Sequence, residues 1–339
     1  MKILYTGPLG KWTTTEARRK AFIELGHEIF LVDSSPLHAA TNLLGKIQGR
    51  LLTGPTVKWY NNQLLGKARE TLPDMIWVDK GVCVWPRTLE TMKKETGASL
   101  VHYNSDFIQY QKWEYRHYFR SIGLYDVHIT TNAIDIPVLE NMGARKVVRA
   151  EFGYDPEYNR PTELSDEDKL TYGHDMVFIG HWEPATEELL VACARKGLSV
   201  NLWGYGWKHA RNKHLLNNNR RIEPLYGEAY IKTLAAAKIC LCFLSKWNRN
   251  QSAGRTFEIP AIGGFLLAER TPDHFSYFDE GKEAEFFAGP AELIEKAQYY
   301  LKHEERRLAI ARASHDRCLR SAYTHKDRVR QILEMCNLA

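Results

Sequence analysis

The feature that most limits the fold of this chain is a repeated alternation of short apolar segments with amphipathic helical segments. Residues 2–7 form an apolar run, residues 13–26 carry apolar side chains at helical spacing, and residues 28–33 form the next apolar run. Strand, helix and strand therefore follow one another within the first 33 residues. This order predicts a βαβ unit, in which the two strands are parallel and the crossover is right-handed.

The alternation continues along the chain in two series. In the first half, strands are predicted at residues 74–79, 100–103, 126–130 and 147–149. In the second half, strands are predicted at residues 176–179, 200–203, 239–244 and 265–268, before a helical tail over residues 290–338. Residues 153–173 between the two series are polar and rich in Pro and Gly, as is typical of a linker. We therefore predict an α/β protein with two Rossmann-like domains facing a central cleft, where ligands bind at strand carboxyl ends.

Composition and charge restrict the class of protein further. The 339 residues are enough for about two domains, and no apolar run approaches the length of a membrane-spanning helix. The first ten residues read as a strand rather than a signal peptide, so a cytoplasmic location is expected. The net charge is +5, and residues 1–70 hold ten basic against five acidic residues. That excess indicates an anionic partner near the N-terminal part, or simply a solvated basic surface.

The six cysteines do not indicate a metal site. They are scattered, mostly in apolar stretches, and Cys240 and Cys242 lie together in one predicted strand. A zinc site would need a second pair of ligands at a suitable spacing, and the sequence has none. We interpret the cysteines as structural thiols.

Residues 245–270 form the stretch with the clearest functional signal. A polar loop leads into a short helix that opens near Gly254 and stops at a Gly-Gly pair, and a buried strand follows. A helix N-terminus offers unpaired N–H groups and a positive dipole end, which suit a phosphate. Arg255 could pair with that phosphate, and Glu258 could accept hydrogen bonds from a ribose diol. The alternative is a packed helix with a surface ion pair.

Several motifs resemble those of the CgeB-like (spore maturation protein) glycosyltransferases, which have the GT-B fold. They are RTFEIPAIGGFLLAERT and the following FDEGKEAEFF, DMIWVDKGVCVWPRTLETMKKETGASLVHYNSD, YDVHITTNAIDIPVLENMGARKVV, FGYDPEYNRP and VFIGHWEPATEELLVACARKGLSVNLWGYGW. The resemblance spans most of residues 74–290, whereas the first 70 residues match only in outline. It implies an acceptor-binding domain at 1–155, a linker at 156–172, a donor-binding domain at 173–320, and a helix at 321–339 that packs back on the first domain.

The resemblance also implies a set of donor-binding residues. Many GT-B enzymes carry an E-x7-E signature. Its second glutamate matches Glu258, which would bind the ribose hydroxyls, and its first falls on Asn250, a departure that still allows a hydrogen bond to a sugar hydroxyl. Other positions match loops that hold the diphosphate or the base, namely Gly180, His181, Trp182, Gly204, Tyr205, Tyr226, Gly227, Lys246, Gly254 and Arg255. His181 could instead be a solvated loop residue with no ligand, and Lys246 could instead belong to a plain basic loop.

Catalytic and acceptor-binding residues are expected in the first half. The loop that holds Gly7 and Lys11 follows the first strand but is not a GxGxxG motif, so it indicates a surface for the acceptor and not a dinucleotide site. An inverting transferase needs a base for the acceptor hydroxyl. Asp106 is our first candidate and Asp79, paired with Lys80, the second. For each of these aspartates the alternative is a helix cap or a structural ion pair.

The acceptor is open, and one alternative is nucleic acid. Residues 107–120 are aromatic and basic, and Arg116 and Arg120 could hold phosphates while aromatic side chains stack against a flipped base. The enzyme would then glycosylate a hydroxymethylated DNA base. The alternative for this stretch is an aromatic helix that packs in the first domain.

We therefore expect a glycosyltransferase that moves a sugar from a nucleoside diphosphate donor, UDP by preference, to an acceptor hydroxyl. The acceptor partner could be anionic, either DNA or a phosphorylated glycan. Residues 166–168 (DED) fit a DxD metal motif but lie in the polar linker, where a solvated turn is expected. Because GT-B enzymes usually rely on helix dipoles and basic side chains, we predict no metal and no further cofactor. A non-catalytic module that binds sugar nucleotides is the remaining alternative, because Asn250 replaces a glutamate.

Overall fold

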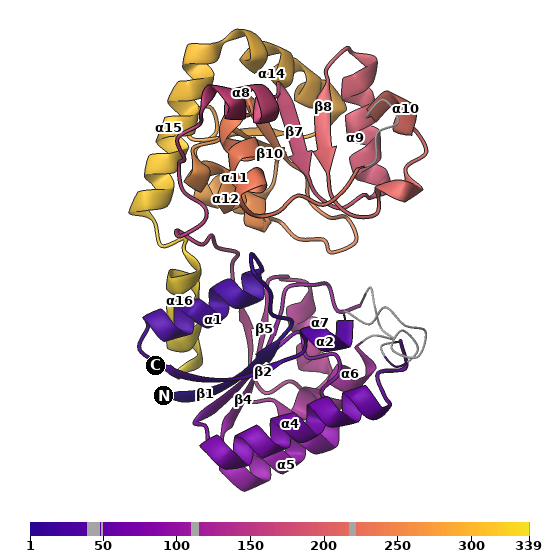
Figure 1. Cartoon of the computed structure of the whole chain (residues 1–339), viewed down its shortest axis with the longest axis vertical. Coiled ribbons are helices and arrows are strands. Elements are labelled where there is room, and N and C mark those ends of the chain that lie inside the picture. Colours follow the sequence, from indigo (N-terminus) through magenta and orange to yellow (C-terminus); the bar gives the residue numbers. More distant parts are fainter. Residues whose placement is uncertain (39–47, 49, 110–114, 217–221, 339) are drawn as a thin grey trace. The chain divides into compact units, whose positions relative to one another are not determined.

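The computed structural model describes residues 1–38, 48, 50–109, 115–216 and 222–338, and it divides the chain into two compact units (Figure 1). Unit 1 consists of Met1–Glu151 and His325–Ala339, and unit 2 of Phe152–Thr324. The chain therefore passes from one unit to the other twice, at residues 151–152 and at residues 324–325.

Unit 1 contains a six-stranded parallel sheet in the order β2-β1-β3-β4-β5-β6. Its strands are β1 (Lys2–Gly7), β2 (Glu28–Asp33), β3 (Met75–Asp79), β4 (Ser99–Asn104), β5 (Val127–Thr130) and β6 (Val147–Arg149). Ile3 of β1 is in register with Ile29 of β2 on one side and with Met75 of β3 on the other. Because helices cover both faces, the strands are apolar along most of their length, and this explains why simple apolar runs predicted them.

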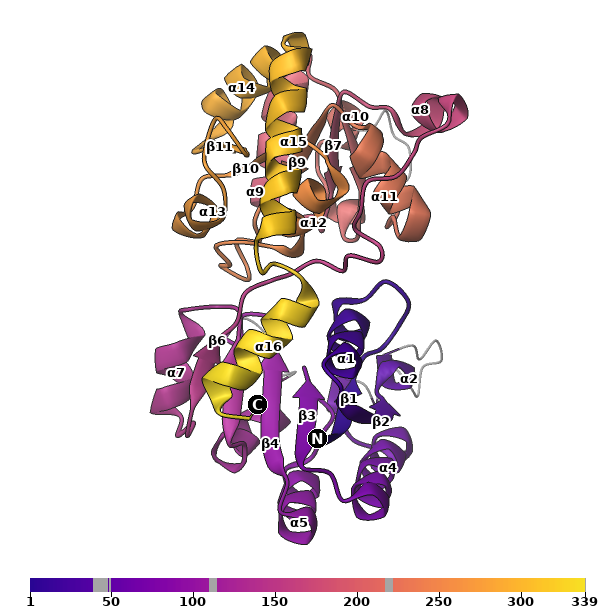
Figure 2. The ribbon, with the colours of Figure 1, turned by 90° about the vertical axis from the view of Figure 1, so that its left-hand side faces the viewer.

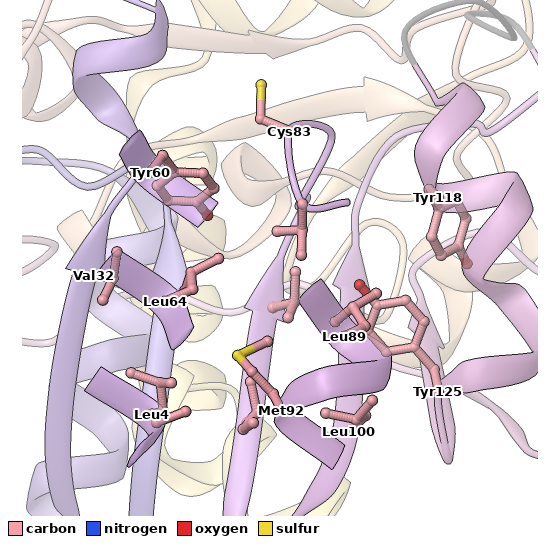
Figure 3. Close-up of a cluster of buried hydrophobic side chains, with 14 of the residues drawn as sticks. Leu4, Val32, Tyr60, Leu64, Cys83, Leu89, Met92, Leu100, Tyr118 and Tyr125 are labelled. Atoms are coloured by element: carbon pink, nitrogen blue, oxygen red, sulfur yellow. The ribbon is translucent and has the colours of Figure 1, made fainter. Parts of the chain in front are cut away.

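Helices cover the two faces of the unit 1 sheet. The described helices are α1 (Thr14–Glu24), α2 (Ser35–His38), α4 (Pro55–Thr71), α5 (Pro86–Thr96), α6 (Arg116–Ser121), α7 (Asp135–Asn141) and α16 (His325–Cys336). On one face, Leu4, Tyr60, Leu89 and Tyr118 belong to a buried cluster from the strands and from α4, α5 and α6 (Figure 3). On the other face, α1 and α16 lie against the sheet (Figure 2). The buried cluster there, with Ile3 and Trp77, includes side chains of these two helices.

Unit 2 contains a five-stranded parallel sheet in the order β11-β10-β9-β7-β8. Its strands are β7 (Met176–Ile179), β8 (Val200–Trp203), β9 (Ile239–Cys242), β10 (Leu266–Glu269) and β11 (Glu285–Phe287). Its described helices are α8 (Asp166–Tyr172), α9 (Pro184–Arg195), α10 (Lys213–Leu216), α11 (Gly227–Ala236), α12 (Gly254–Ile262), α13 (Pro272–Tyr277), α14 (Pro290–Lys302) and α15 (Glu304–Arg320). The predicted α/β fold with two parallel sheets is therefore confirmed.

Two predicted segments differ in detail from the structure. The segment expected to be a linker contains helix α8, which begins with a capping box between Ser165 and Asp168, and it belongs to unit 2. The helical tail predicted over residues 290–338 is divided into α14, α15 and α16, with breaks at His303 and at residues 321–324. A break at 321–324 coincides with the second passage between the units.

Strand order fixes where each sheet can bind a ligand. In unit 1 the first strand, β1, lies between β2 and β3, and in unit 2 the first strand, β7, lies between β8 and β9. At such switch points the loops leave adjacent strand ends in opposite directions, so a crevice forms at the carboxyl ends. A ligand is therefore expected at the loops after β1 and β3 in unit 1 and after β7 and β9 in unit 2.

Candidate functional site

The loop after β9 leads into α12, whose first turn has no side-chain cap. The residue before the helix is Ala253, and it has no polar side chain where Ser, Thr, Asp or Asn would usually cap the N–H groups. The helix is fixed from behind by Phe257 and Ile259, which are fully buried. It ends at Gly263, which has a φ of +89°. The first turn of α12 therefore presents backbone donors that no side chain satisfies among the described residues.

A phenol, a carboxylate and a guanidinium gather at the start of α12. The Tyr230 hydroxyl, on α11, donates a hydrogen bond of 2.5 Å to Oε2 of Glu258. The other oxygen, Oε1, lies over Gly254, since a Cβ on that glycine would be 3.0 Å away from it. Burial and the Glu258 charge raise the pKa of Tyr230 well above its ordinary value, so Tyr230 remains a donor. Nε of Arg255 is buried and has no hydrogen-bond partner in the described part of the chain.

Tyr230 was not predicted from the sequence as a site residue. It lies on α11, in a segment without a motif, and only the packing of α11 beside α12 brings it to Glu258. Three of the predicted donor residues, Gly254, Arg255 and Glu258, do lie together at this point.

The loops after β7 and β9 are joined by a buried carboxylate. Glu183 is 4% exposed and accepts hydrogen bonds from the Ser245 hydroxyl and from the backbone N–H of Lys246 (2.8 Å). Glu183 was also missed from the sequence, because its role depends on a loop 62 residues away. Lys246 itself forms an ion pair with Glu269 at the end of β10, and its side chain is half exposed.

The loops after β7 and β8 touch through their backbones at two glycines. Gly204 has a φ of +140°, and a Cβ there would lie 1.9 Å from the carbonyl oxygen of Gly180. The N–H of Trp182 donates to the carbonyl of Tyr205 at 2.8 Å. Only glycine at position 204 permits this contact, which fixes the loop that carries Tyr205 beside the loop that carries His181 and Trp182.

Aromatic side chains gather along these loops. The hydroxyl of Tyr226 donates to that of Tyr205 at 2.9 Å, and each side chain is about half exposed. The His181 ring lies 5.5 Å from the Tyr205 ring, and the Trp182 ring lies 6.2 Å from that of Trp247. Burial and the hydrogen bond to Tyr205 raise the pKa of Tyr226 to about 12. Exposed aromatic faces of this kind can stack on a planar base.

In unit 1, Asp79 lies in a fully buried ion pair. Its carboxylate accepts hydrogen bonds from Nε and Nη2 of Arg18 (2.8 and 3.1 Å) and from the Tyr5 hydroxyl (3.0 Å). The Arg18 guanidinium also lies 4.0 Å from the centre of the Tyr103 ring. Both oxygens of this carboxylate accept hydrogen bonds from buried side chains, and neither is exposed to an acceptor hydroxyl. We therefore interpret Asp79 as a structural residue.

Lys80 pairs with Asp106 and not with Asp79. Its ammonium lies 2.8 Å from Oδ2 of Asp106, whose side chain is 28% exposed. Lys80 has a φ of +62°, a left-handed conformation that is unusual for a residue with a side chain. The Tyr115 hydroxyl lies 3.4 Å from the same oxygen of Asp106. The expected Lys80–Asp79 pair is therefore wrong, and Asp106 is the accessible carboxylate of the two.

The predicted acceptor-side residues lie in the same unit. Gly7 ends β1 directly beside Asp79, because a Cβ on Gly7 would be 2.7 Å from the Cβ of Asp79. The ammonium of Lys11 lies 5.0 Å from the Trp12 ring centre, and Trp12 has a φ of +72°. Leu9 N–H, between these residues, donates to the Asp33 carboxylate at 3.2 Å, which fixes the loop after β1.

The aromatic and basic stretch at 107–120 is partly described. Residues 110–114, which include Tyr110, Lys112 and Trp113, lie outside the described residues. Tyr115 and Tyr118 are buried in the core, which agrees with the packing alternative for these two rings. Arg116 and Arg120 lie on α6. The two are one turn apart and therefore lie on one face of α6. Partial burial and then the Arg120 charge lower the pKa of Arg116.

Two further features concern metals and membranes. Among the described residues, no three His, Cys, Asp or Glu side chains are grouped so that they could hold a metal ion. The DED sequence at 166–168 forms the first turn of α8, and Asp168 pairs with Lys232 at 2.8 Å. No helix in the described ranges has both the length and the apolar character that crossing a membrane requires.

Comparison with known proteins gives a family match for part of the chain and a fold likeness for the whole of it. Residues 184–334 match the family described as glycosyl transferase-like. No curated protein matches the sequence. Similar solved structures include HepE (Alr3699) of Anabaena in complex with UDP-glucose, with a TM-score of 0.66, 14% identity and complete coverage of both chains.

Two other solved structures have the same architecture at similar levels of identity. An α-glucosyltransferase in complex with UDP-glucose and DNA containing an abasic site gives a TM-score of 0.68 at 11% identity, with 99% of this chain and 98% of that chain covered. A glycosyltransferase from Rickettsia africae gives 0.64 at 14% identity, with 99% and 97% covered. The segment 184–334 is therefore related to a glycosyl transferase-like family, and the chain as a whole has the fold of the GT-B glycosyltransferases.

Proposed function

We propose that the chain is a glycosyltransferase that moves a sugar from a nucleoside diphosphate donor, with UDP preferred, to an acceptor hydroxyl. The observation that carries the proposal is the start of α12, where an uncapped helix N-terminus adjoins Arg255 and Glu258. HepE, which has the same fold, is known in complex with UDP-glucose. The CgeB-like motifs support the same activity, and membership of that narrower group is part of the proposal.

In this proposal the donor binds at the carboxyl ends of β7, β8 and β9. The N–H groups of Gly254 and Arg255, with the Arg255 guanidinium, neutralise the diphosphate. Glu258 accepts a hydrogen bond from the ribose through Oε1, because Oε2 already accepts one from Tyr230. The base lies against Tyr205 and Tyr226, whose exposed rings offer a surface for stacking.

The other predicted donor residues have supporting roles. Gly180, His181 and Trp182 form the loop after β7 that faces the diphosphate. Gly204 and Gly227, which have φ values of +140° and +64°, shape the loops that carry the two tyrosines. Asn250 offers an uncharged hydrogen bond to a sugar hydroxyl. Lys246 is a weaker candidate for neutralising the charge of the leaving diphosphate, because its ammonium already pairs with Glu269.

Acceptor binding and base catalysis are assigned to unit 1. If the reaction inverts, the acceptor oxygen attacks the anomeric carbon, the bond from that carbon to the diphosphate breaks, and Asp106 takes the hydroxyl proton. The ammonium of Lys80 lies 2.8 Å from Oδ2 of Asp106 and holds this carboxylate in place at the end of β4. Gly7 and Lys11 line the acceptor side.

The proposal includes no metal and places the chain in the cytoplasm. The helix N-terminus and the arginine supply positive charge at the diphosphate, which is the part a metal plays in other transferases. All six cysteines are buried free thiols, as is usual for proteins of a reducing compartment.

Release of UDP from a panel of UDP-sugars, measured with acceptor mixtures and with water, tests the activity. We expect turnover of at least one donor, and about 10-fold or greater loss of UDP affinity in Glu258→Ala because the ribose contact is removed. Binding of UDP without turnover of any donor would favour a non-catalytic sugar-nucleotide module. If no nucleotide is bound or turned over, the proposal fails.

A second candidate is a transferase that modifies DNA. It is favoured by the α-glucosyltransferase of similar fold, which binds UDP-glucose and DNA, and by the adjacent arginines at 116 and 120. Binding of duplex DNA that weakens with salt, and weakens again in Arg116→Ala with Arg120→Ala, would support this acceptor. Unchanged DNA binding in the double variant would exclude these arginines as the contact.

A further inference from the structure

Behind the first turn of α12 lies a buried chain of hydrogen bonds that contains no residue predicted from the sequence. Oγ1 of Thr256 lies 3.0 Å from the backbone nitrogen of Ala253 and 2.9 Å from Nε2 of His274. Nδ1 of His274 lies 2.6 Å from the backbone oxygen of Glu269. Thr256 and His274 are both fully buried, so water does not compete for these contacts.

The donor and the acceptor of each hydrogen bond from Glu269 to Ala253 can be assigned, because the Glu269 carbonyl fixes the tautomer of His274. The Glu269 carbonyl can only accept, so Nδ1 of His274 carries the proton. Burial lowers the pKa of His274, so its imidazole is neutral and Nε2 has a free lone pair. The Thr256 hydroxyl must therefore donate to Nε2, and its oxygen accepts from the N–H of Ala253.

The contact at the N–H of Ala253 matters for the ligand side of the helix. Ala253 is the residue that precedes α12, and it cannot cap the helix with its own side chain. Thr256 holds the backbone of Ala253 from inside the core, so the N–H groups of Gly254 and Arg255 keep a fixed direction. Because the side chain of Ala253 is not polar, it does not cap these two N–H groups. His274 is held in turn by α13 and by stacking of its ring on Phe286, at 5.5 Å and 12°.

We propose that Thr256 and His274 are positioning residues, which hold the first turn of α12 in the conformation that binds the donor diphosphate. Neither residue touches the ligand; they act through the backbone of Ala253. This inference rests on the proposed function for its ligand, but the positioning of the backbone can be measured without any nucleotide.

The test uses pairs of variants of the full chain. Thr256→Val removes the hydroxyl at constant shape, and Thr256→Ser restores it. His274→Gln places an amide oxygen where Nε2 accepts from Thr256, whereas His274→Asn keeps only the contact with Glu269. Thr233→Val is the matched control, because Thr233 is a fully buried threonine of unit 2 whose hydroxyl has no hydrogen-bond partner among the described residues.

The first readout is amide hydrogen exchange of Ala253 without ligand. We expect Thr256→Val and His274→Asn to exchange about 10-fold faster than the natural chain or more, and Thr256→Ser, His274→Gln and Thr233→Val to stay within about 3-fold. Equal exchange in Thr256→Val and the natural chain would overturn the positioning role. This readout stands even if the natural chain binds no UDP, a result that would refute only the proposed function.

The second readout is the affinity for UDP, measured by calorimetry. We expect about 10-fold weaker binding in Thr256→Val and His274→Asn, with binding retained in Thr256→Ser and in Thr233→Val. A loss of thermal stability in Thr256→Val without a loss of UDP affinity would show that the network serves only the core, and would overturn the inference.

Discussion

Tyr230 donates a hydrogen bond to one oxygen of Glu258, and the other oxygen of Glu258 lies over Gly254 at the first turn of α12. The phenol therefore determines which oxygen of the carboxylate faces the ligand.

We expect Tyr230→Phe to weaken UDP binding by about 3- to 10-fold, because Glu258 loses the partner that orients it. Calorimetric titration of UDP measures the effect. Tyr226→Phe is a useful comparison, since it removes a hydroxyl that donates to Tyr205 at the exposed end of the aromatic cluster and keeps the ring. Equal UDP affinity in Tyr230→Phe and the natural chain would show that this contact does not orient Glu258.

Gly204→Ala should destabilise unit 2 by more than about 3 kcal/mol, because the new Cβ would lie 1.9 Å from the backbone oxygen of Gly180 at a φ of +140°. Gly197→Ala is the control, because Gly197 has a φ of +76° with open space around the Cβ, and should cost only about 1 kcal/mol. Urea unfolding of the two variants measures the difference. Equal costs would mean that the loops after β7 and β8 are not in direct backbone contact.

The ion pair between Arg18 and Asp79 should contribute to stability and not to catalysis. Asp79→Asn leaves a buried guanidinium without its counter-charge, so we expect a loss of about 3 to 5 kcal/mol of unfolding free energy. Asp106→Asn should leave stability almost unchanged, because Asp106 is partly exposed. It should lower kcat, because the proposed base is removed. Thermal melts and rates of UDP release separate the two effects. A stable but inactive Asp79→Asn would restore Asp79 as a candidate base.

Asp135 predicts a pH dependence of stability. It is fully buried, accepts a hydrogen bond from Thr130, and burial raises its pKa to about 7. The pKa of Asp135 is about 4 in the unfolded chain and about 7 in the folded chain. Between these two pH values the folded chain keeps a proton that the unfolded chain releases, so the unfolding free energy falls as pH rises from about 4 to about 7. Asp135→Asn should remove this fall, so that it is about 1 to 3 kcal/mol more stable than the natural chain at pH 8.

Asp126 gives the control of opposite sign. Burial acts against its charge, but Lys93 and the N–H of Leu100 outweigh burial and lower the pKa of Asp126. Asp126→Asn should therefore lose stability above pH 4 and approach the natural chain in acid. Urea unfolding from about pH 2 to about pH 8 measures both variants. The Asp126→Asn variant gives the contribution of Asp126, which is subtracted from the pH profile of the natural chain. If the remaining stability does not fall between about pH 4 and about pH 7, the assignment to Asp135 is contradicted.

Most of the strands could be predicted from the sequence because they are buried on both faces, as every residue of β3 and β9 is. Apolar runs such as those of β1, which ends at Gly7, and β7, which Gly180 follows, are enough to identify them. The three-residue strand β11 was missed, because its apolar content is only Phe286 and Phe287. The start of α12 was also predictable, since a polar loop and a glycine precede the helix.

The partners of the charged residues could not be predicted, because they depend on packing between distant segments. Asp79 was expected to pair with its neighbour Lys80, but Arg18, 61 residues away, reaches it through the packing of α1 on the sheet. Tyr230 and His274 lie outside the motifs, and Glu183 lies in one that assigns it no role. Each meets its partner only where two distant segments pack together. The sequence therefore indicates which strand ends hold the chemistry but not which side chains orient it.

A crystal structure with UDP tests the central claim most directly. We predict the diphosphate at the N–H groups of Gly254 and Arg255, the ribose at Oε1 of Glu258, and the base against Tyr205 or Tyr226. UDP bound in unit 1, or in unit 2 away from the start of α12, would contradict the account.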